Sequence, residues 1–173
     1  MPVLSSLPPV SAALAARGVS LRPAEAADAG FARDVYVEAR REEMAPAGWP
    51  EPVLLAFLHD QFRLQTLHYD QHYADAARLI VEVEGVPAGR LILLDAGGEV
   101  RVVDIALLPA FRRLGIGGAL MDWVLVLARD LGRPIVSLHV EPNNPALRLY
   151  SDRGFQPVAQ RGVYLLMERR TDP

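Results

Sequence analysis

The segment PAFRRLGIGGALM, residues 109–121, places two arginines and three glycines directly before an apolar run with helical spacing. A helix that begins within residues 115–118 exposes unpaired backbone N–H groups at its positive end. Glycines let an anion come close to these groups, and Arg112 and Arg113 can add charge-assisted hydrogen bonds to phosphate oxygens. The pattern predicts a phosphate site, with a tight strand-to-helix turn as the alternative interpretation of the glycines.

Two other phosphate motifs fit this segment less well. A P-loop requires Gly-Lys-Ser/Thr after its glycines, and this region contains no lysine. A dinucleotide fingerprint requires the spacing Gly-x-Gly-x-x-Gly after a parallel β-α-β start. Here the glycines are Gly115, Gly117 and Gly118, and they follow consecutive short strands. Neither motif explains the segment.

The elements that must position this loop follow from apolar periodicity. A strand at 19–24 precedes helices at 24–43 and about 53–72, which the proline-rich connection MAPAGWPEP separates. Strands at 77–84, 89–95 and 99–108, joined by short turns, predict an antiparallel meander. A helix then runs from the glycine loop, residues 112–118, to about Asp130. A strand follows at 134–140.

The C-terminal part is predicted to add a short helix and two strands. The helix lies in NPALRLYSDRG, with Asn144 as N-cap and Gly154 as C-cap, and the strands lie in FQPVA and VYLLMER. The whole order, β-α-α-β-β-β-α-β-α-β-β, predicts an α/β fold of the three-layer α+β kind. Its sheet of about seven strands is expected to be mixed and mostly antiparallel, with helices on both faces.

The composition predicts one soluble domain. The net charge of −3 gives no general attraction to nucleic acid, and no apolar stretch approaches the roughly 18 residues of a membrane span. The absence of cysteine excludes disulfides, thiolate metal ligands and a cysteine nucleophile. Residues 1–18 are predicted to be a flexible extension without a secretory signal, and residues 19–170 a single domain. We expect a cytoplasmic protein.

Two segments resemble motifs of the GNAT superfamily of acyl-CoA-dependent N-acyltransferases. The signature Arg/Gln-x-x-Gly-x-Gly/Ala matches Arg112, Gly115 and Gly117, after a strand and Pro109. A second family segment, Leu-x-Val-x-x-x-Asn followed by a short helix with Tyr and then Gly-Phe, matches Leu138, Val140, Asn144, Tyr150, Gly154 and Phe155. The order of elements is also the family's, so the resemblance covers about residues 19–168 and implies the GNAT fold.

The resemblance implies that acetyl-CoA binds at the glycine loop and along the preceding strand. Its pyrophosphate would lie on the N–H groups of residues 113–118, and its pantetheine arm would pair with the strand edge at residues 105–107. A strand that parts from its neighbour offers unpaired N–H and C=O groups for such an arm. The implied cofactor-binding residues are Ile105, Ala106, Leu107, Arg112, Arg113, Leu114, Gly115, Ile116, Gly117, Gly118, Asn143, Asn144 and Tyr150.

One departure from the family pattern concerns the asparagines. Tyr150 follows Asn144 at a spacing one residue shorter than the family's usual one. Asn143 restores the spacing to Tyr150 but loses the fit to Leu138 and Val140. Which asparagine meets the cofactor therefore stays open.

The implied reaction requires a neutral amine, an oxyanion donor and a proton for the departing thiolate. An alkyl amine with a pKa of about 10.4 is mostly protonated at neutral pH, so its proton must be taken. The family pattern suggests a backbone N–H near Leu107 as the oxyanion donor and Tyr150 as the proton donor to the thiolate. The alternative for Tyr150 is that it only packs the short helix on the sheet. Without cysteine, we expect direct transfer within a ternary complex.

The base is left open among residues of two strands. Asp104 lies within the apolar stretch VVDIALL, which favours either a catalytic or substrate-contacting role or a structural pairing, for example with an arginine. His139, whose ordinary pKa is about 6.5, and Glu141 end the next strand. Histidine on a strand is more often a bystander, and Glu141 fits a solvated rim. A water chain can also replace any single base.

The acceptor pocket is expected at the first two helices and their connection. Glu42 and Glu43 can attract a cationic amine and Trp49 can wall the pocket, whereas a solvated helix end and a core aromatic are the alternatives. The stretch HYDQHY, residues 68–73, can join the same rim. No spacing in it suggests a metal site, and no metal is expected.

Together these inferences predict an acetyl-CoA-dependent N-acetyltransferase that acts on a primary amine of a small molecule or peptide. A non-catalytic acyl-CoA-binding regulatory module is the main alternative, and a structural glycine loop in a protein with another ligand is the third. No nucleic-acid or membrane partner is expected. A homodimer through the late strands, as is common in the family, stays open, as do the identity of the amine and the length of the acyl chain.

Overall fold

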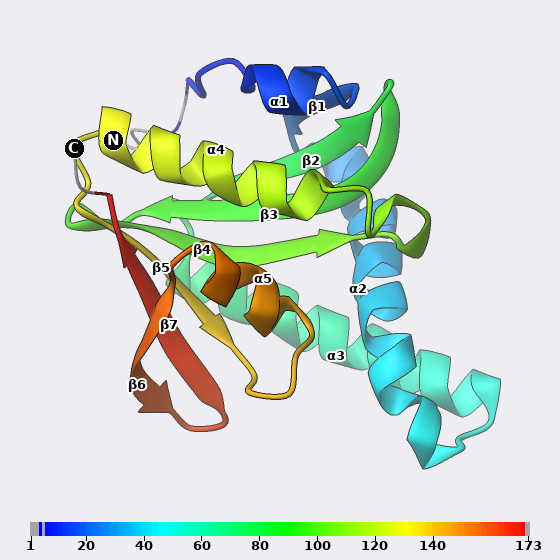
Figure 1. Cartoon of the computed structure of the whole chain (residues 1–173). Coiled ribbons are helices and arrows are strands. Elements are labelled where there is room, and N and C mark those ends of the chain that lie inside the picture. The colour runs from blue at the N-terminus through cyan, green and yellow to red at the C-terminus, as the bar shows by residue number, and fades with distance from the viewer. Residues whose placement is uncertain (1–3, 5, 172–173) are drawn as a thin grey trace.

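A seven-stranded sheet with the order β1-β2-β3-β4-β5-β7-β6 forms the centre of the protein (Figure 1). The computed structural model describes residue 4 and residues 6–171. Every neighbouring pair of strands is antiparallel except β4 and β5, which run parallel, so the predicted mixed sheet is confirmed. The strands are β1 (Val19–Pro23), β2 (Ala77–Val83), β3 (Val86–Asp95), β4 (Glu99–Leu107), β5 (Ile135–Val140), β6 (Gln156–Arg161) and β7 (Tyr164–Arg170).

Helices cover both faces of this sheet. Helix α4 (Ile116–Asp130) lies on one face with α1 (Ala12–Ala15) and α5 (Ala146–Asp152), and α2 (Ala29–Met44) and α3 (Glu51–His72) lie on the other (Figure 1). Short 3-10 turns lie between these elements at η2 (Ala26–Asp28), η3 (Ala45–Ala47) and η4 (Pro109–Phe111). The predicted three-layer architecture and its element order are confirmed, with α1 and these turns as additions.

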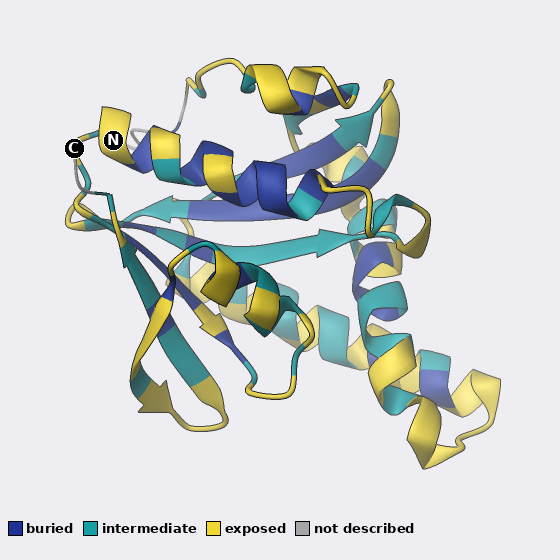
Figure 2. Cartoon of the chain, viewed as in Figure 1, coloured by how far each residue is buried: buried dark blue, intermediate teal, exposed yellow. Residues whose placement is uncertain are grey.

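Helix α4 forms the centre of the main core because apolar side chains recur on the side that it turns to the sheet. Leu120, Met121 and Val124 are fully buried there, as their spacing predicts. Leu91 and Leu93 of β3 belong to the same buried cluster, which is dark blue in Figure 2. This packing gives the glycine loop, at the start of α4, a rigid support.

Strand β4 parts from β5 halfway along its length. The two strands pair only over residues 99–102 of β4 and 135–138 of β5, while β4 continues beside β3 as far as Leu107. A β-bulge coincides with the separation, because Val102 and Asp104 have partners on β3 and Val103 has none. The far half of β4 therefore presents an edge without a β5 partner.

The segment before β1 is folded in part onto the domain, although the sequence suggested a flexible extension. Leu14 of α1 is fully buried and Leu4 is 6% exposed, and both belong to the main core. The indole Nε1 of Trp123 donates a hydrogen bond of 3.3 Å to the carbonyl of Pro9. Residues 1–3 and 5 of the predicted extension lie outside the described residues. The described part of this segment thus packs on α4.

The first long helix begins later than predicted. Residues 26–28 form a 3-10 turn, and α2 starts at Ala29. Both carboxylate oxygens of Asp28 accept hydrogen bonds from Arg22, at 2.7 and 2.9 Å, and Asp28 also accepts one from the N–H of Glu25. These bonds, the one from Arg22 above all, lower the pKa of Asp28 to about 2. The chain is therefore tied to β1 before the helix proper begins.

The caps of α5 differ by one residue from the prediction. Pro145 occupies the N-cap position instead of Asn144, and Arg153 the C-cap position instead of Gly154. The Oδ1 atom of Asn144 still accepts a hydrogen bond of 2.9 Å from the N–H of Ala146, so it satisfies a free donor of the helix start. Gly154 follows the C-cap with a φ of 78°, the left-handed conformation that ends many helices.

Candidate active site

The glycine loop delivers the N-terminus of α4 to the end of β4. Gly115 is the N-cap of α4 and has a φ of 79°, a left-handed conformation that favours glycine. The N–H of Ala119 donates a hydrogen bond of 3.1 Å to the carbonyl of Gly115, and this is the first hydrogen bond of the helix. The N–H groups of residues 116–118 therefore precede the first helical hydrogen bond and are available to an acceptor from outside the helix.

The three glycines of the loop differ in what a side chain would do at each position. Gly115 is needed for its backbone conformation, whereas a side-chain carbon on Gly118 would lie 2.0 Å from Nη2 of Arg153. Arg153 packs there because its Nε donates to the carbonyl of Gly118 at 3.1 Å and to Asp122 at 2.9 Å. Gly117 has space around it, since a side-chain carbon would meet only Leu149, at 3.6 Å. Gly118 thus serves packing, while Gly117 keeps the loop open.

The two loop arginines are placed differently. Arg112 donates from Nε to the carbonyl of Leu107 at 2.9 Å, and its Nη1 lies 3.5 Å from a carboxylate oxygen of Glu42 on α2. It therefore fastens the loop to β4 and α2. Arg113 is exposed and has a φ of 59°, a left-handed conformation for a residue with a side chain. Its guanidinium forms no ion pair with any residue that the structure describes, which leaves it available to an anion.

The open edge of β4 directs backbone groups away from β3 at alternate residues. The N–H of Leu108 donates to the carbonyl of Ala88 at 2.8 Å, on the β3 side. Since backbone groups alternate along a strand, those of Leu107 and Ile105 point to the side that β5 has left. The hydrogen bond from Arg112 to the carbonyl of Leu107 agrees with this direction. The N–H of Leu107 thus faces the opening, by which we mean the side of β4 residues 103–107 from which β5 has separated.

Tyr150 of α5 packs in the main core, near enough to Asp104 of β4 for that charge to act on its phenol. It is 7% exposed, and its ring meets that of Phe155 edge-on with 6.1 Å between centroids. Burial raises the pKa of Tyr150 to about 12, with a smaller contribution from the negative charge of Asp104. The packing role that the sequence suggested is therefore present, and the phenol stays protonated at neutral pH.

Asp104 pairs with an arginine, as one of the two sequence interpretations suggested. Its carboxylate forms an ion pair with Arg90 of β3, and Nη2 of Arg90 also donates to Oε1 of Gln65 at 2.7 Å. The guanidinium carbon of Arg90 lies 5.7 Å from the centre of the Phe62 ring, a cation–π geometry. Burial raises the pKa of Tyr69, and the charge of Asp104 adds to this effect. The ion-pair partner of Asp104 thus comes from β3, and Arg90 extends the contact to α3.

Arg90 and Gln65 are the residues of this cluster that sequence reasoning missed. Arg90 is a charged residue within the apolar strand sequence GRLILLD, which is the same signal that singled out Asp104. That signal could have found Arg90. Gln65 carries no comparable signal, because a glutamine on an amphipathic helix is ordinary.

His139 lies on the same face of the sheet as Arg101. The pleat places Ser137 and His139 of β5 on one face, and Nε of Arg101 lies 3.4 Å from the hydroxyl of Ser137. His139 is exposed, and partial desolvation together with the positive charges of Arg101 and Arg161 lowers its pKa. The imidazole is therefore uncharged at neutral pH.

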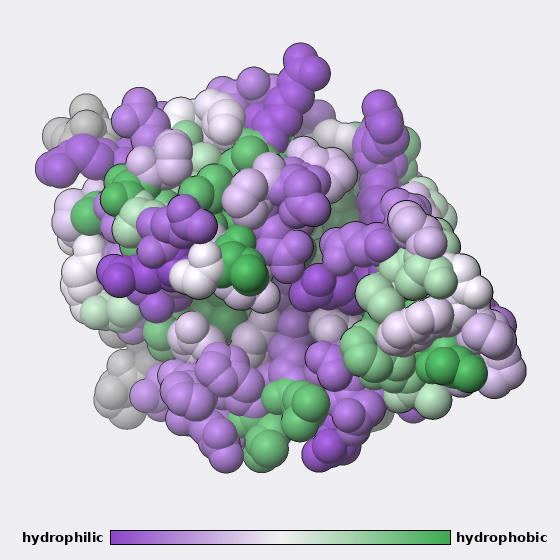
Figure 3. Space-filling model, turned by 90° about the horizontal axis from the view of Figure 1, so that it is seen from below, coloured by the Kyte–Doolittle hydropathy of each residue, from purple (hydrophilic) through white to green (hydrophobic). Residues whose placement is uncertain are grey.

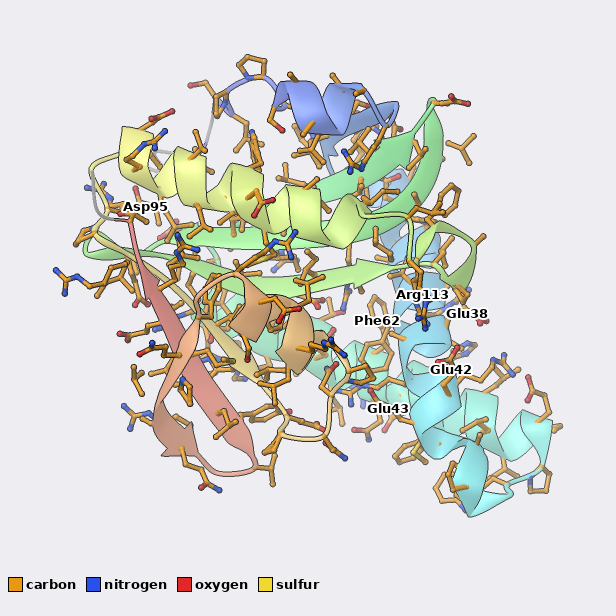
Figure 4. The ribbon with its side chains drawn as sticks, in the orientation of Figure 1. Glu38, Glu42, Glu43, Phe62, Asp95 and Arg113 are labelled. Atoms are coloured by element: carbon orange, nitrogen blue, oxygen red, sulfur yellow. The ribbon has the colours of Figure 1, made fainter. Side chains whose placement is uncertain are left out.

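The acidic residues predicted for the acceptor pocket lie along α2, as Figure 4 shows for Glu42 and Glu43. Glu42 approaches Arg112, and Glu43 accepts a hydrogen bond of 2.9 Å from Nη1 of Arg40. The same atom of Arg40 lies 3.7 Å from Glu141, at the end of β5. Arg40 thus joins α2 to the β5–α5 connection, and carboxylates gather around it.

Trp49 lies in the connection between α2 and α3. It is 42% exposed and packs edge-on against Phe57, with ring centroids 5.2 Å apart. Val53, 53% exposed, belongs to the same end of the molecule, where Figure 3 shows apolar surface. Trp49 thus packs on α3, while Glu42 and Glu43 lie beside arginines, and their shared role at the acceptor stays a prediction.

The two asparagines are used differently. The Oδ1 atom of Asn144 accepts a hydrogen bond from the N–H of Ala146, whereas Asn143 is exposed on the loop before α5.

Within residues 4 and 6–171, no group of three or more histidine, aspartate or glutamate side chains is arranged to hold a metal ion. None of the described helices has both the length and the apolar character needed to cross a membrane. The cytoplasmic location stays a prediction.

Comparison with known proteins bears on the same elements. The model of the family described as Acetyltransferase (GNAT) family matches residues 35–155, more than half of the chain. The chain belongs to this GNAT acetyltransferase family. The match includes both segments that suggested the resemblance, the glycine loop and the segment from Leu138 to Phe155. GNAT members are acyltransferases, and the open sheet of this chain is the GNAT fold.

Relatives support the GNAT assignment at two levels. A mycothiol acetyltransferase of Thermomonospora curvata is 44% identical over 71 residues, which are 40% of this chain and 23% of that protein. The chain thus matches less than a quarter of this curated relative's length. The PaiA N-acetyltransferase of Thermoplasma acidophilum, solved with coenzyme A, has a TM-score of 0.69 at 17% identity and covers 88% of this chain and 98% of its own. The structure of yncA from Salmonella typhimurium with acetyl-CoA has a TM-score of 0.57 at 20% identity, covering 90% and 95%.

Proposed function

We propose that this GNAT protein transfers an acetyl group from acetyl-CoA to a primary amine within a ternary complex. The observation that carries the proposal is the open edge of β4 beside the N-terminus of α4. Free backbone groups on that edge fit the amide-bearing arm of acetyl-CoA, and the free N–H groups of residues 116–118 fit its pyrophosphate. The complexes of PaiA with coenzyme A and of yncA with acetyl-CoA support the same co-substrate.

The residues at the opening have distinct proposed tasks. Acetyl-CoA supplies a thioester, and an uncharged amine forms the new C–N bond as the C–S bond breaks. The N–H of Leu107 is the proposed donor to the carbonyl oxygen that gains negative charge. Tyr150 is the proposed donor to the departing sulfur. Since the pKa of Tyr150 is about 12 and that of a thiol about 8.5, the phenol stabilises the thiolate by a hydrogen bond and keeps its proton.

The proton of the attacking amine is proposed to reach His139 through water. The imidazole is uncharged at neutral pH because partial desolvation and two arginines lower its pKa, so a ring nitrogen can accept a proton. Asp104 has its charge opposed by Arg90 and is proposed to position groups at the opening. His139 is therefore the better candidate for the base.

The acceptor is proposed to enter between α2 and the β5–α5 connection. Glu43 and Glu141 share Arg40 there, and Glu42 stands beside Arg112. Carboxylates around this entrance favour a cationic amine over an anionic one. A small-molecule amine and a peptide amine both satisfy this electrostatic condition.

Thermal unfolding followed by a thiol-release assay tests the proposal. Acetyl-CoA at about 100 times its dissociation constant should stabilise the protein by about 2.7 kcal/mol, which raises the unfolding midpoint by about 5 to 10 °C at this size. A panel of small and peptide amines should then include at least one that releases thiol from acetyl-CoA. A midpoint shift without thiol release would favour the non-catalytic module, and no shift with acetyl-CoA or coenzyme A would overturn the proposal.

A further inference from the structure

The segment before β1 places Arg17 against the glycine loop. A side-chain carbon on Gly115 would lie 3.2 Å from Nη2 of Arg17 and 3.3 Å from its Nε. The guanidinium therefore lies directly beside the N-cap residue of α4, where helical N–H groups are free. Arg17 belongs to neither of the two segments that resemble family motifs, and it lies far from Gly115 in the sequence.

The position of Arg17 is held by anchors on both sides. Before it, Leu14 is fully buried in the main core, and the hydroxyl of Ser11 caps α1. After it, Val19 is 3% exposed, and the carbonyl of Gly18 accepts a hydrogen bond of 2.8 Å from the N–H of Glu84. Short distances to these fixed points leave the Arg17 backbone little freedom to move from α4.

The charge of Arg17 is not neutralised by the protein around it. Its Nη1 donates to the carbonyl of Ala13 at 2.8 Å, and no carboxylate within the described part of the chain pairs with it. Arg112, by contrast, is committed to the carbonyl of Leu107 and to Glu42. Arg17 is exposed, so its remaining N–H groups are open to a ligand.

We propose that Arg17 binds the pyrophosphate of acyl-CoA, so that the segment before β1 completes the cofactor site. A guanidinium offers two parallel donors to phosphate oxygens, and beside Gly115 they add to the N–H groups of α4. Arg17 and Arg113 then supply one cation from each side of the loop. This inference rests on the proposed function, because it assigns a residue to the same cofactor site.

Calorimetric titration of the full chain with coenzyme A and with dephospho-coenzyme A tests the inference. Arg17→Ala should weaken binding of both ligands by the same factor, about five- to twentyfold, because both contain the pyrophosphate. Arg17→Lys should recover part of the loss, since lysine keeps the charge and lacks the fork. Arg63→Ala is the matched control: Arg63 is an exposed arginine on α3, paired with Asp60, and its removal should leave both affinities unchanged.

The outcomes separate the inference from the function on which it rests. Wild-type affinity in Arg17→Ala overturns the inference and leaves the proposed function standing, provided that the wild type binds coenzyme A. A loss with coenzyme A alone also overturns it, since that result assigns Arg17 to the 3′-phosphate. Failure of the wild type to bind either ligand overturns both proposals. In turnover, the expected change for Arg17→Ala is a raised KM for acetyl-CoA at an unchanged kcat.

Discussion

Arg90 and Asp104 form a largely buried ion pair between the neighbouring strands β3 and β4. Their side chains are 8% and 18% exposed, and Arg90 extends the pair to Gln65 of α3. Burial of a charge is costly unless a partner opposes it. The pair therefore fastens α3 to the half of β4 that has parted from β5, and each charge depends on the other.

Replacement of one partner should cost more than replacement of both. Asp104→Asn leaves the guanidinium of Arg90 buried without its carboxylate, so the free energy of unfolding should fall by about 3 kcal/mol. Arg90→Met should have a comparable effect for the same reason. In the double variant the losses should be far from additive, since no uncompensated charge remains. Urea unfolding of the four proteins measures this coupling, and additive losses would contradict the mutual dependence.

Removal of the Tyr150 hydroxyl should slow the reaction without ending it. Tyr150→Phe keeps the ring that packs on Phe155, so the unfolding midpoint should stay within about 1 °C. The kcat should fall by about ten- to hundredfold, because the variant removes a hydrogen bond to the thiolate but does not remove a proton transfer. The KM for acetyl-CoA should change little. Steady-state kinetics decide between this role and pure packing, which predicts an unchanged kcat.

Protonation of His139 should set the acid side of the pH profile. Its pKa is lowered, so the imidazole accepts a proton at neutral pH and loses that ability only as the pH falls below this lowered pKa. His139→Gln should reduce kcat by about a hundredfold and remove this step from the pH dependence of kcat. A profile of the variant that keeps the same step would assign proton transfer to another group.

The same substitution at two loop glycines should have opposite effects. Gly115→Ala forces a side chain into a left-handed conformation and against Arg17, so stability should fall by about 1–2 kcal/mol and coenzyme A binding should weaken. Gly117→Ala meets only Leu149 at an ordinary contact distance and improves helix propensity, so stability should hold or rise. Thermal unfolding of both variants checks this difference. Equal losses would mean that the loop tolerates no side chain at either position.

Asp28 should contribute to stability at neutral pH and lose that contribution in acid. Its pKa in the folded protein is about 2, below the value of about 3.9 for an unfolded aspartate, so the stabilisation is complete above that value. It disappears as the pH falls from about 4 to about 2. Asp28→Asn should therefore lower the unfolding midpoint at pH 7 and flatten its fall across this interval. Asp75→Asn, which removes an exposed carboxylate, controls for the lost charge.

Local patterns in the sequence predicted the elements and the family. The order of strands and helices follows from periodicities of two and 3.6 residues. The glycines and arginines of the loop lie within the short segment 112–118. These features depend on neighbouring residues. For that reason the sheet, the glycine loop and its place at the start of α4 could be stated without coordinates, with errors of one to a few residues at the caps of α5 and the start of α2.

The partners of the charged residues were decided by tertiary structure. Asp104 and His139 could be singled out as unusual on their strands, yet only the register of β3 with β4 assigns Arg90 to Asp104. Likewise, only the fold places Glu42 beside Arg112 and Trp49 against Phe57 of α3.

The amino-acid sequence alone establishes the chemistry that this chain can offer: free N–H groups at a helix start, a tyrosine in a short C-terminal helix, and no cysteine. The folded arrangement is needed to see that β4 leaves β5 after Val102 and that Arg17 lies against Gly115. Both facts are contacts between distant parts of the chain. They arise because the bulge at Val103 redirects β4 and because burial of Leu14 draws the N-terminal segment onto α4.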